Sequence, residues 1–297
     1  MRLNPRLRAL AVRTLVVAAT LLLPAQAVQA KSFAWKVTGK SGGVVYLVGS
    51  IHVLSPDFYP LAPALEQTFK DSDLLVEEVD LAEMLDPTVQ MQSLSSGMLP
   101  AGQSLDKVLS PSTLALVKKS MGDLGPAGVA LMQFKPWMVA VALEGIELAK
   151  VGFDPDLGLD KHFYDMAKEA GKPVQGLETA AYQISRFDTM TMEQQDHMLA
   201  ETLKELDTEV TSVNKLGEAW KAGDTASVER VVLADLKSDP VMYQRLLVDR
   251  NRNWMPKIEA LFARKGHTLV VVGAAHLVGP DGLLAALKAK GYTVEQL

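Results

Sequence analysis

Two segments of the chain follow one pattern: an apolar run, a glycine, two small or apolar residues and a histidine. They are VVYLVGSIH, which ends at His52, and TLVVVGAAH, which ends at His276. The unbroken apolar run at residues 268–273 is typical of a strand buried on both faces, as in the parallel sheets of α/β proteins. Such sheets bind ligands beyond the carboxyl ends of their strands. The pattern therefore predicts an α/β fold in which His52 and His276 lie at the edge where a site forms.

The rest of the chain supplies further strands and long helical segments. Strands are predicted at residues 33–38, 44–49, 74–79, 172–176, 268–273 and 292–295. The first two are joined by the glycine-rich segment GKSGG, which favours a hairpin. Apolar residues at helical spacing cover most of the remaining sequence. We therefore expect a mixed central sheet with helices on its faces and two helical excursions near the strand ends, at about residues 81–170 and 180–266.

The first 30 residues have the layout of a signal peptide. Four arginines precede or punctuate an apolar run that ends near Leu23, and the small-residue segment AQAVQA follows. A basic start, a short apolar segment and a small-residue cleavage site are typical of exported proteins. We expect cleavage after Ala30, with Ala27 as the alternative, and a single mature domain over residues 31–297. The competing interpretation is an uncleaved membrane anchor, although the apolar run is short for a span of about 20 residues.

Composition excludes several classes of protein. The chain has 297 residues and no cysteine, which excludes a disulfide scaffold, a cysteine-ligated zinc site and a cysteine nucleophile. The net charge is −5, and because nucleic-acid-binding modules are usually basic, we expect no nucleic-acid partner. The motifs HExxH, GxSxG and GxGxxG are absent, so the zinc-protease helix, the serine-hydrolase elbow and the dinucleotide fingerprint have no support. No segment after the first 30 residues is long and apolar enough to span a membrane, so we expect a periplasmic or secreted protein.

Acidic residues follow two more of the predicted strands. Glu77 and Glu78 lie near the end of the run LLVEEVD, and Glu178 follows KPVQG. Side chains alternate along a strand, so Glu77 and Glu78 should point to opposite faces, and at most one should face a shared site. Glu178 has a competing role as an acid in the first turn of a helix, where the helix dipole stabilises it. Four strand ends therefore each deliver a histidine or a glutamate.

These strand-end residues are candidate ligands of a metal ion. Imidazole and carboxylate groups together suit a divalent ion such as Zn²⁺, Mn²⁺, Co²⁺ or Fe²⁺. Two histidines with one or two carboxylates leave an open position for water, whose pKa the metal lowers. The competing interpretation is that each histidine is a hydrogen-bonded structural residue. Arg250, on a predicted helix, would clamp a substrate carboxylate or orient a ligating acid, or else lie on a solvated helix face.

Together these segments resemble the TraB/GumN family, which includes the TIKI-type proteins. The resemblance covers residues 33–297 and rests on YLVGSIHVL, LVEEVDL, GLDKHFYDMAKEAGKPVQGLETAAYQ, DRNRNW and VVVGAAHLVGPDGLLAALKAKGYTVE. It implies a metal-dependent, hydrolase-like α/β fold. It also implies that His52 and His276 belong to the paired GxxH motifs of the family, and that Glu178 is the glutamate of its GLE motif.

The resemblance assigns further residues. The Arg-Asn pair of the family maps onto Arg250 and Asn251, and its G-x-D segment maps onto 158–160, where Asp160 is either a second-tier site residue or a helix cap. The strand-end glutamate of the family maps best onto Glu78. Glu77 stands where the family usually has an apolar residue, and this departure leaves the choice between the two glutamates open.

From the residues and the resemblance we expect an exported metal-dependent hydrolase that acts on peptides, as TIKI-type members do. The two GxxH histidines and one of Glu78 and Glu178 would hold the metal, a divalent ion such as Mn²⁺, Co²⁺ or Zn²⁺, and the other glutamate would be the general base. Arg250 would stabilise the oxyanion or grip a substrate carboxylate, with Asp160 as a second substrate-binding residue. The alternative is a non-catalytic periplasmic protein that binds a peptide or glycan, linked to envelope or exopolysaccharide processes. The sequence leaves the oligomeric state open.

Overall fold

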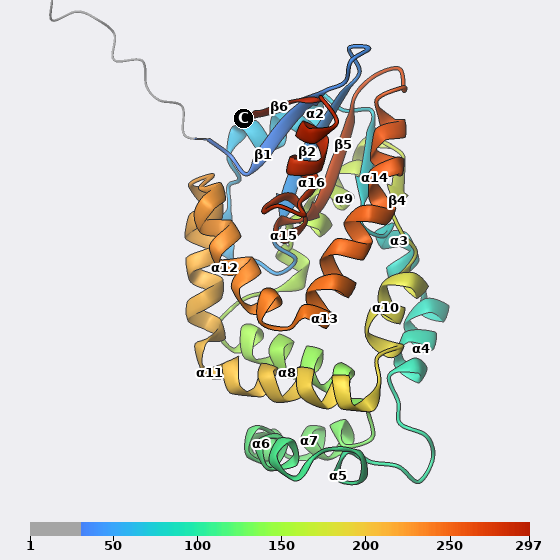
Figure 1. The fold of residues 1–297 in the computed structure, drawn as a ribbon, viewed down its shortest axis with the longest axis vertical. Coiled ribbons are helices and arrows are strands. Elements are labelled where there is room, and N and C mark those ends of the chain that lie inside the picture. The colour runs from blue at the N-terminus through green and yellow to red at the C-terminus, as the bar shows by residue number, and fades with distance from the viewer. Residues whose placement is uncertain (1–30) are drawn as a thin grey trace, which may run out of the picture. The chain divides into compact units, whose positions relative to one another are not determined.

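A six-stranded mixed sheet forms the centre of the computed structural model, which describes residues 31–297 (Figure 1). The strands are β1 (Ala34–Thr38), β2 (Val44–Ser50), β3 (Leu74–Glu77), β4 (Val174–Gly176), β5 (Thr268–Gly273) and β6 (Thr293–Gln296). Their order across the sheet is β4-β3-β5-β2-β1-β6. The strands from β4 to β2 run parallel to one another, whereas β1 is antiparallel to both of its neighbours. The predicted α/β class and mixed sheet are confirmed.

The central position of β5 follows from its composition. Its apolar residues 269–272 have no exposed surface, as expected for a strand that is covered on both faces. Because β5 lies between β2 and β3, the register sets Gly273 beside Ser50 and Val271 beside Glu77. The carboxyl ends of these three strands therefore lie side by side.

Two strands are shorter than predicted, for local reasons. The strand predicted at 74–79 ends at Glu77, because Asp80 caps the next helix by accepting a hydrogen bond from the Ala82 amide and so turns the chain away from the sheet. The strand predicted at 172–176 begins at Val174, after Pro173, which has no amide hydrogen for a strand ladder.

Helices surround the sheet and extend beyond its carboxyl edge. They are α2 (Pro63–Lys70), α3 (Leu81–Met84), α4 (Pro87–Ser96), α5 (Leu105–Val108), α6 (Pro111–Met121), α7 (Pro126–Leu131), α8 (Pro136–Lys150), α9 (Leu159–Ala170), α10 (Ala180–Asp188), α11 (Met192–Lys221), α12 (Thr225–Ser238), α13 (Pro240–Tyr243), α14 (Asp249–Leu261), α15 (Ala274–Leu277) and α16 (Leu283–Ala289). A π-helical turn, Gln244–Val248, joins α13 to α14. Within residues 31–297, no helix combines the length and the apolar character that crossing a bilayer requires.

The two predicted helical excursions share one core. Buried residues of the first, such as Leu105, Val117 and Leu143, pack with Leu199 and Leu203 of α11 from the second. Figure 1 shows the resulting helical lobe, made of α5, α6, α7, α8 and the first part of α11, at the end of the molecule away from β6. The lobe has its own hydrophobic core, separate from the core around the sheet.

The first excursion also returns to the sheet before it ends. Helix α9 packs against β3 through a face that includes the fully buried Leu159 and Phe163. This return brings the first turn of α9, with Asp160, close to the strand ends. The predicted signal peptide, residues 1–30, lies outside the described residues, so the division into a signal peptide and one mature domain stays a prediction.

Candidate functional site

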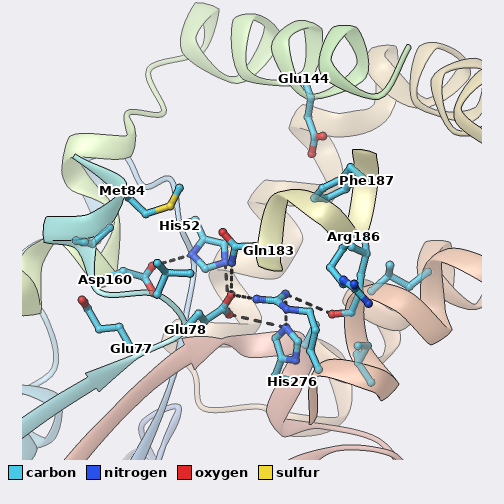
Figure 2. A pocket seen from close by; sticks show the side chains of 17 residues that line it. His52, Glu77, Glu78, Met84, Glu144, Asp160, Gln183, Arg186, Phe187 and His276 are labelled. Atoms are coloured by element: carbon cyan, nitrogen blue, oxygen red, sulfur yellow. Dashed lines mark hydrogen bonds and ion pairs between the residues drawn. The ribbon is translucent and has the colours of Figure 1, made fainter. Parts of the chain in front are cut away.

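A cavity of about 640 Å³ opens at the carboxyl ends of β2, β3 and β5 (Figure 2). Its charged and polar lining consists of His52, Glu77, Glu78, Glu144, Asp160, Gln183, Arg186, Arg250 and His276. Apolar side chains from α3, α10 and α12 and from the π-helical turn complete the wall. The cavity therefore lies where the parallel strands of an α/β sheet usually build a ligand site.

The glycines of both GxxH motifs are required by close packing. A side chain at Gly49 would collide with the ring of Phe33, whose nearest atom would be 2.5 Å from the added carbon. A side chain at Gly273 would lie 3.2 Å from Glu78 Oε1 and from His52 Nε2. The missing side chain at Gly273 thus leaves room for the strand-end residues to approach one another.

His276 is buried and held in one tautomer. Asn251 donates its side-chain amide hydrogens to the carbonyls of His276 and Asp281, so its oxygen must accept from Nδ1 of His276, at 2.8 Å. Nε2 therefore carries the lone pair, and Arg250 Nη1 donates to it at 3.1 Å. Burial lowers the pKa of His276 to about 3, so the imidazole is neutral at physiological pH.

His52 lies at the mouth of the cavity, and 60% of its side chain is exposed. Nδ1 donates a hydrogen bond of 2.8 Å to Asp160 at the start of α9. The carboxylate of Asp160 raises the pKa of His52 to about 9, against the opposing effect of burial. This contact fixes the ring so that Nε2 faces Glu78 (Figure 2).

The two histidines converge on one oxygen of Glu78. Nε2 of His52 is 3.9 Å from Glu78 Oε1, and Nε2 of His276 is 3.8 Å from the same atom. The amide of Gly273 donates to that oxygen at 2.7 Å. Burial alone would raise the pKa of Glu78, but Arg250 and the two histidines lower it overall, so the carboxylate is ionised.

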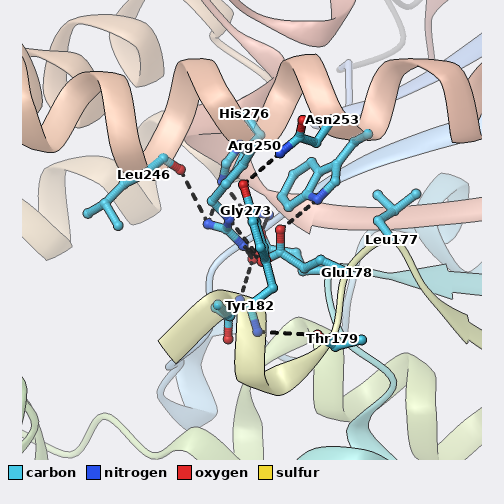
Figure 3. Close-up of polar contacts among 12 residues, drawn as sticks. Leu177, Glu178, Thr179, Tyr182, Leu246, Arg250, Asn253, Gly273 and His276 are labelled. Atoms are coloured by element: carbon cyan, nitrogen blue, oxygen red, sulfur yellow. Dashed lines mark hydrogen bonds and ion pairs between the residues drawn. The ribbon is translucent and has the colours of Figure 1, made fainter. Parts of the chain in front are cut away.

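Arg250 joins the second glutamate to this group (Figure 3). Its Nε and Nη2 donate to Glu178 Oε1 at 2.9 and 2.7 Å, and Nη2 also contacts Glu78 Oε2. Trp254 donates to the other oxygen of Glu178 at 2.8 Å, and the guanidinium lies over its ring. All three charged residues are less than 9% exposed. Burial lowers the pKa of Arg250, but the two carboxylates outweigh it and raise the pKa overall.

All six residues predicted for the site belong to this connected network. It runs from Asp160 through His52 to Glu78, and then through Arg250 to Glu178 and His276. Within the network, Glu178 lies behind Arg250 and does not line the cavity.

The match to a protein family extends over nearly all of the described residues. The pattern of the TraB/PrgY/gumN family matches residues 33–296, a range that includes both GxxH motifs, the two glutamates and Arg250. The chain belongs to the TraB/PrgY/gumN family. The resemblance seen in the sequence is therefore confirmed.

Three similar proteins are each described as uncharacterized. The chain is 28% identical over 247 residues to the uncharacterized protein YbaP of Escherichia coli K12. The matched region covers 82% of this chain and 87% of that protein. The protein of the same description from Shigella flexneri matches equally. An uncharacterized protein of Treponema pallidum is 20% identical over 271 residues, covering 86% of this chain and 80% of that protein. No solved structure gives a significant match.

Sequence reasoning did not single out several residues of the site. Gln183 donates to Glu78 Oε2 at 3.2 Å, Trp254 fixes Glu178, and Arg186 lines the cavity. Gln183 and Trp254 lie within the segments GLETAAYQ and DRNRNW that carry the likeness to the TraB/PrgY/gumN family, so their position there was the available signal. Arg186 lies between these two segments, outside both, and gave no such signal.

Glu77 is the departure from the TraB/PrgY/gumN pattern, and it has a different environment from Glu78. The expectation that at most one of the two glutamates faces the site is wrong, because β3 ends at Glu77 and both glutamates line the cavity, but only Glu78 approaches the histidines. Glu77 is 1% exposed, and neither of its carboxylate oxygens has a hydrogen-bond partner among the described residues. Burial, helped by the charge of Asp160, raises its pKa from 4.5 to about 9.

We expect the substitution Glu77→Gln to flatten the pH dependence of stability. Because the folded protein holds this proton more tightly than the unfolded chain, Glu77 costs stability increasingly as the pH rises from about 4.5 towards 9. At pH 8 the variant should be more stable by about 1–3 kcal/mol. Urea unfolding at several pH values measures this, with the exposed Glu169→Gln as the control. Equal pH slopes for wild type and Glu77→Gln would contradict the prediction.

Proposed function

We propose that this protein is an exported hydrolase that binds a divalent metal ion at His52, Glu78 and His276 and acts on peptides. One observation carries the metal site. Each histidine has its Nδ1 bonded to an oxygen, of Asp160 in one case and Asn251 in the other, and each turns Nε2 towards the same oxygen of Glu78. Metal-ligating histidines almost always have such a partner on the second ring nitrogen, because it fixes the ring and raises its basicity.

The donor atoms fit a divalent ion in their chemistry, and their separations are somewhat longer than a bound ion requires. Ligand atoms about 2.0–2.2 Å from a tetrahedral ion lie about 3.4 Å apart, and the two Nε2 atoms are 3.9 and 3.8 Å from Glu78 Oε1. Within residues 31–297, however, no three His, Cys, Asp or Glu side chains form a ready metal centre. Arg250 Nη1 donates a hydrogen bond to the lone pair of His276 Nε2. This hydrogen bond would have to break before His52, Glu78 and His276 could bind one ion.

Glu178 has a different role in this proposal from Glu78. Both of its oxygens are bonded, one to Arg250 and one to Trp254, and it does not line the cavity. We therefore propose Glu78 as the ligand and Glu178 as the carboxylate that positions Arg250. When bound, a divalent ion supplies Lewis acidity, which polarises a carbonyl group and lowers the pKa of water.

Arg250 would then act on the substrate. Its Nη1 donates to His276 Nε2 and to the Leu246 carbonyl, and its Nε and Nη2 are held by Glu178. If His276 held an ion, the hydrogen that Nη1 now directs at His276 would be available to a substrate. A donor held in this way is pre-organised to stabilise negative charge on a substrate carbonyl oxygen. The likeness to TIKI-type proteins supports peptides as the substrate class, and the signal-peptide layout of residues 1–30 supports export.

Elemental analysis of the mature protein, purified without a histidine tag, tests the metal site. After incubation with Mn²⁺, Co²⁺ or Zn²⁺ and removal of free ions, we expect about one ion per chain. The matched control is the single variant His197→Ala, which removes an exposed histidine of α11. Absence of metal from the wild-type protein under all three conditions would contradict the proposal.

A second candidate function is non-catalytic binding of a peptide or glycan in the same cavity. It is favoured by the contact between Arg250 Nη1 and His276 Nε2, because the lone pair that would bind a metal ion already accepts a hydrogen bond. Thermal unfolding separates the two functions, because a ligand that binds only the folded state raises the melting temperature. Stabilisation by metal ions favours the hydrolase, whereas stabilisation by a peptide or glycan without turnover or a metal effect favours the binding protein.

A further inference from the structure

Arg186 is a cation in the cavity that the proposed chemistry does not use. It lies on α10 and lines the same cavity as His52 and Glu78. Figure 2 shows Arg186 with Phe187 on the side of the cavity opposite Asp160 and Glu77. Glu144 of α8 also lines the cavity, on the same side as Phe187 (Figure 2).

The guanidinium of Arg186 is held in place by neutral partners. Its carbon atom lies 4.1 Å from the centre of the Tyr182 ring, and Nη2 donates to Ser185 Oγ at 3.0 Å. Ser185 Oγ gives its own hydrogen to the Tyr182 carbonyl, so it can only accept from the arginine. These contacts orient the group without neutralising its charge.

Arg186 lacks the partner that a partly buried arginine normally has. Its Nε is buried and has no hydrogen-bond partner within the described residues. A second cation, Arg245, donates to the backbone carbonyl of Arg186, and burial together with the charge of Arg186 lowers the pKa of Arg245. A buried donor without a partner is unfavourable, and the charge of the guanidinium favours an anionic ligand.

The wall next to Arg186 is apolar. Phe187 lines the cavity and stacks on Trp137 with ring centres 5.7 Å apart, and Leu246 and Met84 also face the cavity. A ligand that reaches Arg186 from His52 must therefore pass apolar side chains. Such a wall suits aliphatic or aromatic groups rather than a sugar.

From this arrangement we infer that Arg186 anchors a substrate carboxylate, so that the preferred substrates are peptides with a carboxylate group and an apolar residue close to the cleaved bond. This inference rests on the proposed function, since it assumes that the bond is cleaved near His52, Glu78 and His276. A planar guanidinium matches a carboxylate through paired, charge-assisted hydrogen bonds. The carboxylate comes from the C-terminus of the peptide or from an acidic side chain.

The test uses the full mature protein and one set of apolar hexapeptides made in three forms. The first form has a free C-terminal carboxylate, the second has a C-terminal amide, and the third has the amide and one internal glutamate. Hydrolysis is followed by mass spectrometry with Mn²⁺, Co²⁺ or Zn²⁺, and binding to the metal-free protein is followed by calorimetry. The variants are Arg186→Gln and Arg186→Lys. Arg230→Gln is the matched control, because Arg230 also donates Nη2 to a serine Oγ but lies outside this cavity.

We expect the wild-type protein to prefer one or both carboxylate forms over the amide by about tenfold or more. The form that is preferred identifies the source of the carboxylate. Arg186→Gln should reduce the preference to about one, Arg186→Lys should keep part of it, and Arg230→Gln should keep all of it. Thermal unfolding checks that each variant is folded.

The outcomes separate this inference from the proposed function. If the peptides are hydrolysed without preference for a carboxylate, or if Arg186→Gln keeps the wild-type preference, the proposed role of Arg186 is overturned. The proposed hydrolase function is not affected by this outcome. If no peptide is hydrolysed, the proposed function fails and the binding data decide. In that case, if the metal-free wild type binds the carboxylate forms more tightly than the amide form and only the Arg186 variants lose this preference, the anchor is supported. If no peptide binds, or if all three forms bind equally, the anchor is overturned.

Discussion

Replacing His52 and His276 together by alanine should abolish metal binding and lower kcat/KM for any peptide substrate by about a thousandfold or more. In the proposed site, the two Nε2 atoms and Glu78 Oε1 are the three atoms that would bind the ion, so the double variant removes two of them. Elemental analysis and a peptide-hydrolysis assay measure the two effects. Circular dichroism should show the same helix content as in the wild type, since neither side chain belongs to the hydrophobic core.

The matched control for this variant is His197→Ala. His197 is 56% exposed and lies on α11, outside the cavity. The His197→Ala variant should therefore have the same metal content and the same rate of peptide hydrolysis as the wild type. Full metal binding and activity in a folded His52→Ala/His276→Ala double variant would show that the paired GxxH motifs shape the fold and are not ligands.

The second large effect concerns stability. Arg250→Leu should lower the free energy of unfolding by about 3–5 kcal/mol, because it leaves two carboxylates buried without their cation. Glu78 and Glu178 both contact this guanidinium and are less than 9% exposed. Urea unfolding followed by circular dichroism gives the value.

Two further variants show whether the effect comes from the buried charges. Adding Glu178→Gln to Arg250→Leu should recover part of the loss, because one uncompensated charge is removed. Arg252→Leu, an exposed position on the same helix, should change stability by less than about 0.5 kcal/mol. A loss of similar size in both arginine variants would mean that α14, and not the charge network, is responsible.

Sequence reasoning predicted the sheet and the meeting of the site residues for one physical reason. Side chains that follow parallel strands gather at one edge, so the order glycine, two residues, histidine after β2 and β5 was enough to bring His52 and His276 together. The same rule placed Glu78 at this edge, whereas strand alternation did not predict that Glu77 also lines the cavity, because β3 ends at Glu77.

Other features depend on contacts that spacing does not encode. Glu178 could be a ligand, a base or a helix acid until the positions of Arg250 and Trp254 were known. The shared core of the helical lobe depends on how α8 and α11 cross, which two separate apolar stripes do not determine. Arg186 stands apart because its significance lies in the partner it lacks, and no sequence pattern marks such an absence.

The place of β5 in the sheet has a consequence for the order of folding. This strand fills the gap between β2 and β3, yet more than 180 residues separate it from either strand in the chain. Until residues 268–273 have been made, β2 and β3 each keep an open edge, and pairing across so long a loop is slow to nucleate. A shortened chain that stops before β5 would lose the middle of the sheet and His276 at once. For a protein exported as proposed, the site therefore assembles only after nearly the whole chain has crossed the membrane.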